Sequence, residues 1–92
     1  MKYENEILLV LKEAGQQGMP LRRIALNVYN ITNSFFQPLS QEDVYADVAA
    51  YLRTKCKQSG APVMKHATRG WYVINYDSAQ VQQLLLNFAE EE

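Results

Sequence analysis

The chain has 92 residues, of which 48% are apolar and 21% are charged, and its formal net charge is −1. A chain of this length forms one domain with one core, which argues against separate catalytic and regulatory lobes. No apolar run approaches the ~20 residues that cross a bilayer, and no signal peptide is recognisable, so we expect a cytoplasmic protein without a membrane partner.

Cysteine and histidine are too scarce for the common metal and redox sites. Cys56 is the single cysteine and His66 the single histidine. The chain therefore cannot form an internal disulfide, or a tetrahedral zinc site by itself. No glycine-rich phosphate loop or arrangement of nucleophile and base is recognisable. We expect no metal, no cofactor and no enzymatic activity.

Apolar spacing predicts two helices in the first third of the chain. The first covers residues 5–16, and its apolar face consists of Ile7, Leu8, Leu11 and Ala14. Residues 19–21 are predicted to be a short extended piece, because a residue before proline is pushed out of the α region. The second helix begins at Leu21 and ends near Asn30.

The clearest helix start in the sequence follows a predicted loop over residues 31–39. Ser40 is expected to cap the third helix, which ends near Ser59, before Gly60. Its predicted inward residues are Val44, Tyr45, Val48, Ala49, Leu52 and Cys56. Its predicted solvent-facing residues are Glu42, Asp43, Ala46, Asp47, Ala50, Arg53, Thr54 and Lys57.

A β-hairpin is predicted after the third helix. Residues 63–65 and 71–75 are short β-prone runs, and Gly70 in the turn between them is free to take a positive φ. Because side chains alternate along a strand, either Trp71 or Tyr72 packs on the core and the other is left at the surface.

The last predicted helix, within residues 77–92, begins at Asp77 or Ser78 and ends in an acidic tail. Its apolar stripe consists of Val81, Leu84, Leu85 and Phe88. This stripe is expected either to fold back on the domain or to form a homodimer interface with a second copy.

The order of these elements predicts a mainly α protein with a small β-hairpin, in the α+β class. The predicted architecture is a winged helix-turn-helix domain over residues 1–76, with a three-helix core and a two-stranded wing. An extra C-terminal helix over residues 77–92 either packs on this domain or dimerises. The alternative is an unrelated small α+β domain.

Several motifs resemble the HARE-type helix-turn-helix family of winged helices. They are residues 7–11, the Gly18-Met19-Pro20-Leu21-x-x-Ile24 stretch, Ser40-x-x-x-Val44 leading to Leu52, and Arg69-Gly70-Trp71-Tyr72. The resemblance covers roughly residues 5–75 and implies a winged-helix fold. It implies either kind of partner, because the family includes modules thought to contact DNA and the amino-terminal domain of the delta subunit of bacterial RNA polymerase, which docks on protein.

Basic side chains are concentrated in one part of the sequence. From Arg53 to Arg69 there are five Lys or Arg residues and no acid, whereas Glu42, Asp43 and Asp47 open the third helix. Acids at the start of a recognition helix oppose contact with DNA, since base contacts usually come from that end. The helix dipole favours the same order of charges without any partner.

These patterns predict a non-enzymatic module that binds double-stranded DNA or a transcription-complex protein. The predicted DNA contacts are Arg22, Arg23, Gln41, Tyr45, Arg53, Lys65, Thr68 and Arg69. The arginines and the lysine are assigned to phosphates, and Gln41 or Tyr45 to base edges. The alternative is a protein-docking domain with no nucleic-acid contact, which uses the acidic start of the third helix or the apolar last helix.

Overall fold

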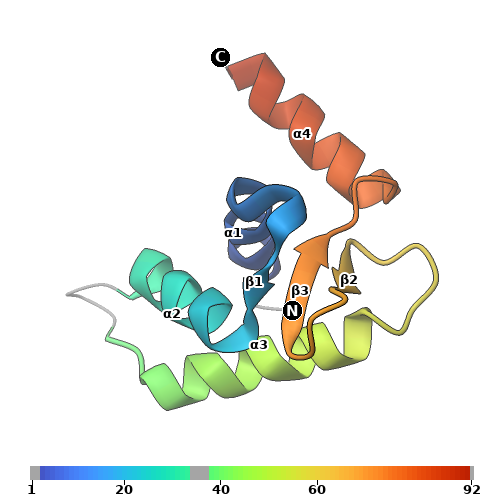
Figure 1. Cartoon of the computed structure of the whole chain (residues 1–92). Helices are drawn as coiled ribbons and strands as arrows, with labels where there is room; N and C mark the ends of the chain where they lie inside the picture. Colours follow the sequence, from blue (N-terminus) through green and yellow to red (C-terminus); the bar gives the residue numbers. More distant parts are fainter. Residues whose placement is uncertain (1–2, 34–37, 92) are drawn as a thin grey trace.

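The structure, a computed structural model, describes the backbone of residues 3–33 and 38–91 and the side chains of these residues up to Asn87. The described residues form four α-helices and a three-stranded antiparallel sheet (Figure 1). The helices are α1 (Glu4–Ala14), α2 (Leu21–Thr32), α3 (Gln41–Lys55) and α4 (Ala79–Glu91), with a 3-10 turn η1 (Gly15–Gln17) after α1. The strands are β1 (Met19–Pro20), β2 (Val63–Lys65) and β3 (Trp71–Ile74). The predicted α+β class is confirmed.

The sheet has one strand more than the predicted two-stranded hairpin. Its order is β1-β3-β2, and β1 pairs with β3 through Met19 opposite Tyr72 and Pro20 opposite Trp71. The sequence predicted an extended piece here but not its pairing, because pairing across a long sequence separation leaves no local pattern. Pro20 fits an edge strand, since proline has no N–H to give to a central ladder.

The core lies where α1, α2 and α3 pack on one face of the sheet. Each helix contributes a fully buried apolar row, as Ile7, Ile24 and Val48 illustrate with 0% exposure. Val63 and Ile74 extend this core from the strands. Figure 1 shows α3 running below α2 and the sheet.

The helix ends differ from the predicted ones by a few residues. Helix α2 continues to Thr32 instead of Asn30. Helix α3 ends at Lys55 instead of Ser59, because the next N–H groups bond three residues back, from Lys57 to Thr54 O and from Gln58 to Lys55 O. Such bonds tighten the chain into turns that cannot continue an α-helix.

The predicted faces of α3 are confirmed with one correction. Every residue predicted to face solvent is exposed. Tyr45, predicted to face inward, is 37% exposed, and Tyr51 at 6% exposure is the buried tyrosine instead. Tyr51 lies seven residues after Val44, two turns along the same stripe, whereas Tyr45 is rotated by about 100° from Val44.

Helix α4 projects past α1 on the opposite side of the molecule from α3 (Figure 1). Ser78 caps it, as its Oγ accepts a hydrogen bond from the N–H of Val81 at 3.5 Å. Val81 is completely buried, and Leu84 and Leu85 pack half-buried against the core, so the described part of the stripe folds back. The side chain of Phe88 and the acidic tail lie outside the described side chains. The homodimer stays a prediction.

Within the part of the chain that the structure describes, no helix has the length and apolarity that spanning a bilayer requires.

Candidate functional site

A pocket with a positively charged lining lies between α3 and the β2–β3 hairpin, and we call it the basic pocket. Its volume is about 440 Å³. It is lined by Leu21, Arg53, Lys57, Lys65, His66, Arg69, Gly70, Trp71 and Tyr72. The lining holds four of the nine Lys and Arg residues of the chain and no carboxylate.

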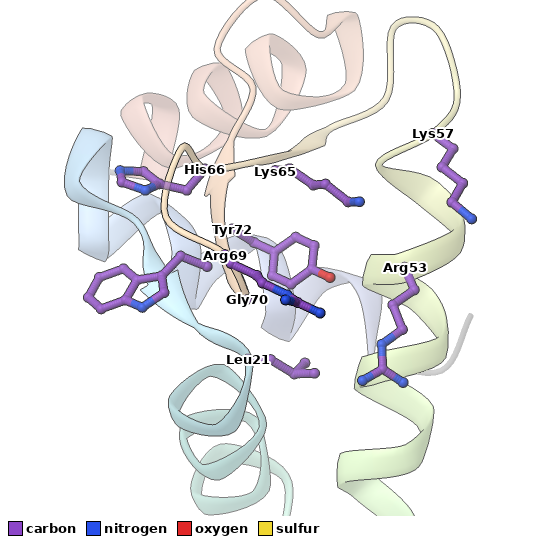
Figure 2. A pocket seen from close by; sticks show the side chains of 9 residues that line it. Leu21, Arg53, Lys57, Lys65, His66, Arg69, Gly70 and Tyr72 are labelled. Carbon is purple, nitrogen blue, oxygen red and sulfur yellow. The ribbon is translucent and has the colours of Figure 1, made fainter.

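The hairpin places Lys65 beside Tyr72 at the edge of the core. These residues are partners across the antiparallel ladder, so their side chains leave the sheet on the same face. Val63 and Ile74 form the other pair on that face and are buried, whereas Lys65 is exposed. Figure 2 shows Lys65 extending from this edge toward α3.

Hydrogen bonds close the turn of the hairpin and fix the backbone around Arg69. Gly70 has a φ of 82°, which a residue with a side chain rarely adopts. The N–H of Trp71 donates to Thr68 O at 3.1 Å, and the N–H of Thr68 donates to Nδ1 of His66 at 3.0 Å. With the turn closed in this way, the Arg69 side chain extends toward α3 (Figure 2).

Helix α3 supplies the facing cations. Arg53 lies in its last turn, and Lys57 lies in the turn that follows the helix; both line the pocket. Figure 2 shows Arg53 running along α3 to the level of Leu21. Among the described residues, neither of these cations forms an ion pair, and nor do Lys65 and Arg69. Their charges are therefore available to an anion.

The structure brings together three of the predicted DNA contacts, Arg53, Lys65 and Arg69, in the basic pocket. Three other predicted contacts, Arg22, Gln41 and Tyr45, line a separate groove of about 600 Å³ between α2 and α3. We call it the α2–α3 groove. Its lining consists of Arg22, Ala25, Leu26, Tyr29, Gln41, Glu42 and Tyr45. Arg23 and Thr68 are exposed and line neither cavity.

Sequence reasoning missed Lys57 and Tyr72 as lining residues of the basic pocket. A signal for Lys57 was its place in the acid-free stretch that runs from Arg53 to Arg69. Tyr72 has no such local signal, because its place in the pocket follows from its pairing with Lys65. Trp71 and Tyr72 do alternate as predicted: Tyr72 is 5% exposed, whereas Trp71 is half-buried beside His66, with 5.9 Å between the ring centres.

The acidic start of α3 has the local structure that the sequence predicted. The Oγ of Ser40 accepts a hydrogen bond from the N–H of Asp43 at 3.4 Å, and Glu42 and Asp43 occupy the first turn. These carboxylates stabilise the positive end of the helix dipole. The two ends of α3 thus carry opposite charges, and only the basic end borders the basic pocket.

The arrangement suits the binding of an anion. Arginine and lysine side chains carry positive charge at neutral pH, and guanidinium groups match the oxygens of phosphates. Within residues 3–33 and 38–91, no group of three or more potential ligands from His, Cys, Asp and Glu is placed to hold a metal ion. No family model matches the sequence, and no curated protein or solved structure is significantly similar to the chain.

Proposed function

We propose that the protein is a winged-helix module that binds double-stranded DNA through the basic pocket, with the β2–β3 hairpin as the wing. The order of three helices followed by a hairpin supports this architecture. The function is binding and not catalysis, because the groups that converge on the pocket are cations suited to holding an anion.

The observation that carries the proposal is the convergence of four unpaired cations on one pocket. In the described residues, Arg53 of α3 and Lys57 in the turn after it line the pocket, and Lys65 and Arg69 line it from the hairpin. Phosphate contacts of this kind supply most of the non-specific affinity of proteins for DNA. The net charge of the chain is −1, but the acids at the start of α3 lie outside the pocket, so they do not cancel the positive charge that meets the phosphates.

The proposed interface reads the DNA backbone more than the base sequence. The amino-terminal part of α3, from which base contacts usually come, carries Glu42, Asp43 and Asp47 on its exposed side. Gln41 and Tyr45, the predicted base contacts, line the α2–α3 groove instead of the basic pocket. We therefore propose weak discrimination between DNA sequences.

A second candidate function is protein docking, and the α2–α3 groove favours it. Leu26 is 48% exposed and Tyr45 is 37% exposed, and both line this groove at the acidic start of α3. A transcription-complex protein that fills the groove would bury these side chains, and its affinity would depend little on salt.

Fluorescence anisotropy of a labelled duplex over a range of salt concentrations tests the DNA proposal. The wild type should lose affinity steeply as salt rises, and Arg53→Ala and Arg69→Ala should each lower the slope of log K against log salt by about 0.9. Lys55→Ala is the matched control, since it removes one positive charge from the last turn of α3 at a residue that does not line the pocket. Absence of binding by micromolar protein at low salt would refute the proposal. An equal change of slope in Lys55→Ala would refute the assignment to the basic pocket.

A further inference from the structure

The hydroxyl of Tyr72 is an unused polar group in the wall of the basic pocket. The Tyr72 residue is 5% exposed, yet among the described residues no group forms a hydrogen bond with its hydroxyl. The same residues contain no fully buried side-chain oxygen or nitrogen without a partner, so this hydroxyl opens to the pocket. Figure 2 shows it directed toward α3, between Lys65 and Arg69. A ligand in the pocket can accept its hydrogen bond.

The shape of the site distinguishes it from a flat basic surface. Lys65 and Arg69 approach from the hairpin and Arg53 from α3, so their charges converge on one hollow instead of forming a row. The backbone of a continuous duplex is convex, and it can meet the cations at the rim without reaching Tyr72. The hydroxyl can be reached by a phosphate that protrudes from the end of a strand.

A terminal phosphate also matches the number of charges and donors. A phosphate monoester carries a charge of about −1.5 to −2 at neutral pH and has three strong acceptor oxygens. An internal phosphodiester carries a single negative charge and has two such oxygens. Two guanidinium groups, two ammonium groups and a hydroxyl line one hollow, and this set fits the monoester better.

We infer that the basic pocket binds a phosphate monoester, carried by the end of a DNA strand. This inference rests on the proposed function and specifies the partner of the same site. A free sugar phosphate carries the same phosphate monoester group as the end of a DNA strand. The experiment distinguishes these two ligands.

The test compares DNA hairpins that have one open end and differ only in whether that end carries a 5′-phosphate, a 3′-phosphate or hydroxyl groups. Anisotropy should show a preference of about tenfold for one of the phosphorylated ends, the effect of a charge-assisted hydrogen bond with its neighbouring charges. Tyr72→Phe should reduce this preference at least about threefold. Tyr76→Phe is the matched control, because Tyr76 is 40% exposed and lies outside the pocket.

Ribose 5-phosphate, titrated in NMR spectra of the same proteins, gives the second arm. Equal affinity for all three ends overturns the inference and leaves the proposed function standing. A preference unchanged in Tyr72→Phe overturns the assignment to the pocket. Binding of ribose 5-phosphate that is lost in Tyr72→Phe, without binding of any duplex, overturns the proposed function and supports the monoester site with a free ligand. Binding of neither overturns both. Circular dichroism verifies that each variant is folded.

Discussion

The hydroxyl of Tyr51 donates a hydrogen bond of 2.6 Å to Oε2 of Glu4 and thereby joins α3 to the first turn of α1. The second carboxylate oxygen, Oε1, accepts a bond of 2.7 Å from Nε2 of Gln80 on α4. One carboxylate thus connects three helices that are far apart in the sequence. Because hydrogen bonds to a charged group are stronger than neutral ones, this contact helps to fix how α4 sits on the domain.

Because Glu4 and Tyr51 contact each other, we expect the protein to lose stability at both low and high pH. Burial raises the pKa of Glu4, but the bonds from Tyr51 and Gln80 and the charge of Lys55 outweigh it and leave the pKa below its usual value. A carboxylate with a lowered pKa stabilises the fold above the unfolded-state pKa, and this contribution is lost as the pH falls through the folded-state pKa.

Tyr51 acts at the other end, because burial and then the bond to Glu4 raise its pKa. The neutral phenol is favoured in the folded state, so its contribution is present below the unfolded-state pKa of about 10 and is lost as the pH rises beyond it. Urea midpoints measured between pH 3 and pH 11 should fall at both ends. In Tyr51→Phe the urea midpoint should decrease less at low and at high pH than in the wild type. The same pH dependence in both proteins would contradict this account.

Removing the partners of this contact should destabilise the protein non-additively. Tyr51→Phe and Glu4→Gln should each lower the free energy of unfolding by about 1 kcal/mol, as for other hydrogen bonds to a charged group at a partly exposed site. The double variant should lose less than the sum, because the residues share one bond. Urea unfolding of the four proteins measures the interaction, and strict additivity would show that the bond contributes nothing.

Gly18 should tolerate alanine far less well than Gly60. Both have a positive φ, 73° and 71°. A Cβ on Gly18 would lie 2.7 Å from the carbonyl oxygen of Tyr72 and from Cγ1 of Val73, whereas a Cβ on Gly60 meets nothing within 4 Å. Gly60→Ala should lower the free energy of unfolding by about 1 kcal/mol, because only the positive φ disfavours alanine there. Gly18→Ala should lower it by about 3 kcal/mol or more, because the new Cβ also meets the neighbouring atoms. Thermal unfolding compares the two, and equal losses would contradict the close approach at Gly18.

The two sides of α4 should respond differently to truncation. Val81 is 0% exposed and Leu86 is 58% exposed. Val81→Ala should lower the free energy of unfolding by about 2 kcal/mol through lost burial and a cavity, and Leu86→Ala by less than about 0.5 kcal/mol. Chemical denaturation measures both changes. A large loss at Leu86 that grows with protein concentration would instead indicate that a second copy covers it.

Local sequence patterns predicted most of the fold because most of its elements have local causes. The cap at Ser40, the stripe of Val44, Val48 and Leu52, and the turn at Gly70 each depend on residues a few positions apart. The pairing of β1 with β3 was not predictable in this way, because Met19 and Tyr72 meet only when the whole domain closes.

The part of the candidate site that could be predicted is the part that the order of charged residues along the sequence reveals. The acid-free stretch from Arg53 to Arg69 pointed to the cations that the pocket brings together. It did not separate them from Arg22, which lies in another cavity, because helix packing decides which face of α2 each side chain joins. The role of Tyr51 was missed for the same reason, since its partner Glu4 lies 47 positions away.

The third strand has a consequence for how the hairpin meets a ligand. Besides the pairing of β1 with β3, the N–H of Leu21 donates to the carbonyl oxygen of Gly70 at 3.0 Å, so the hairpin is tied on one side to the start of α2. The hairpin is thus ordered before any ligand arrives, and little conformational entropy remains to be lost on binding. A ligand held between the hairpin and α3 also links two parts of the core, so its binding energy should raise the melting temperature of the whole domain.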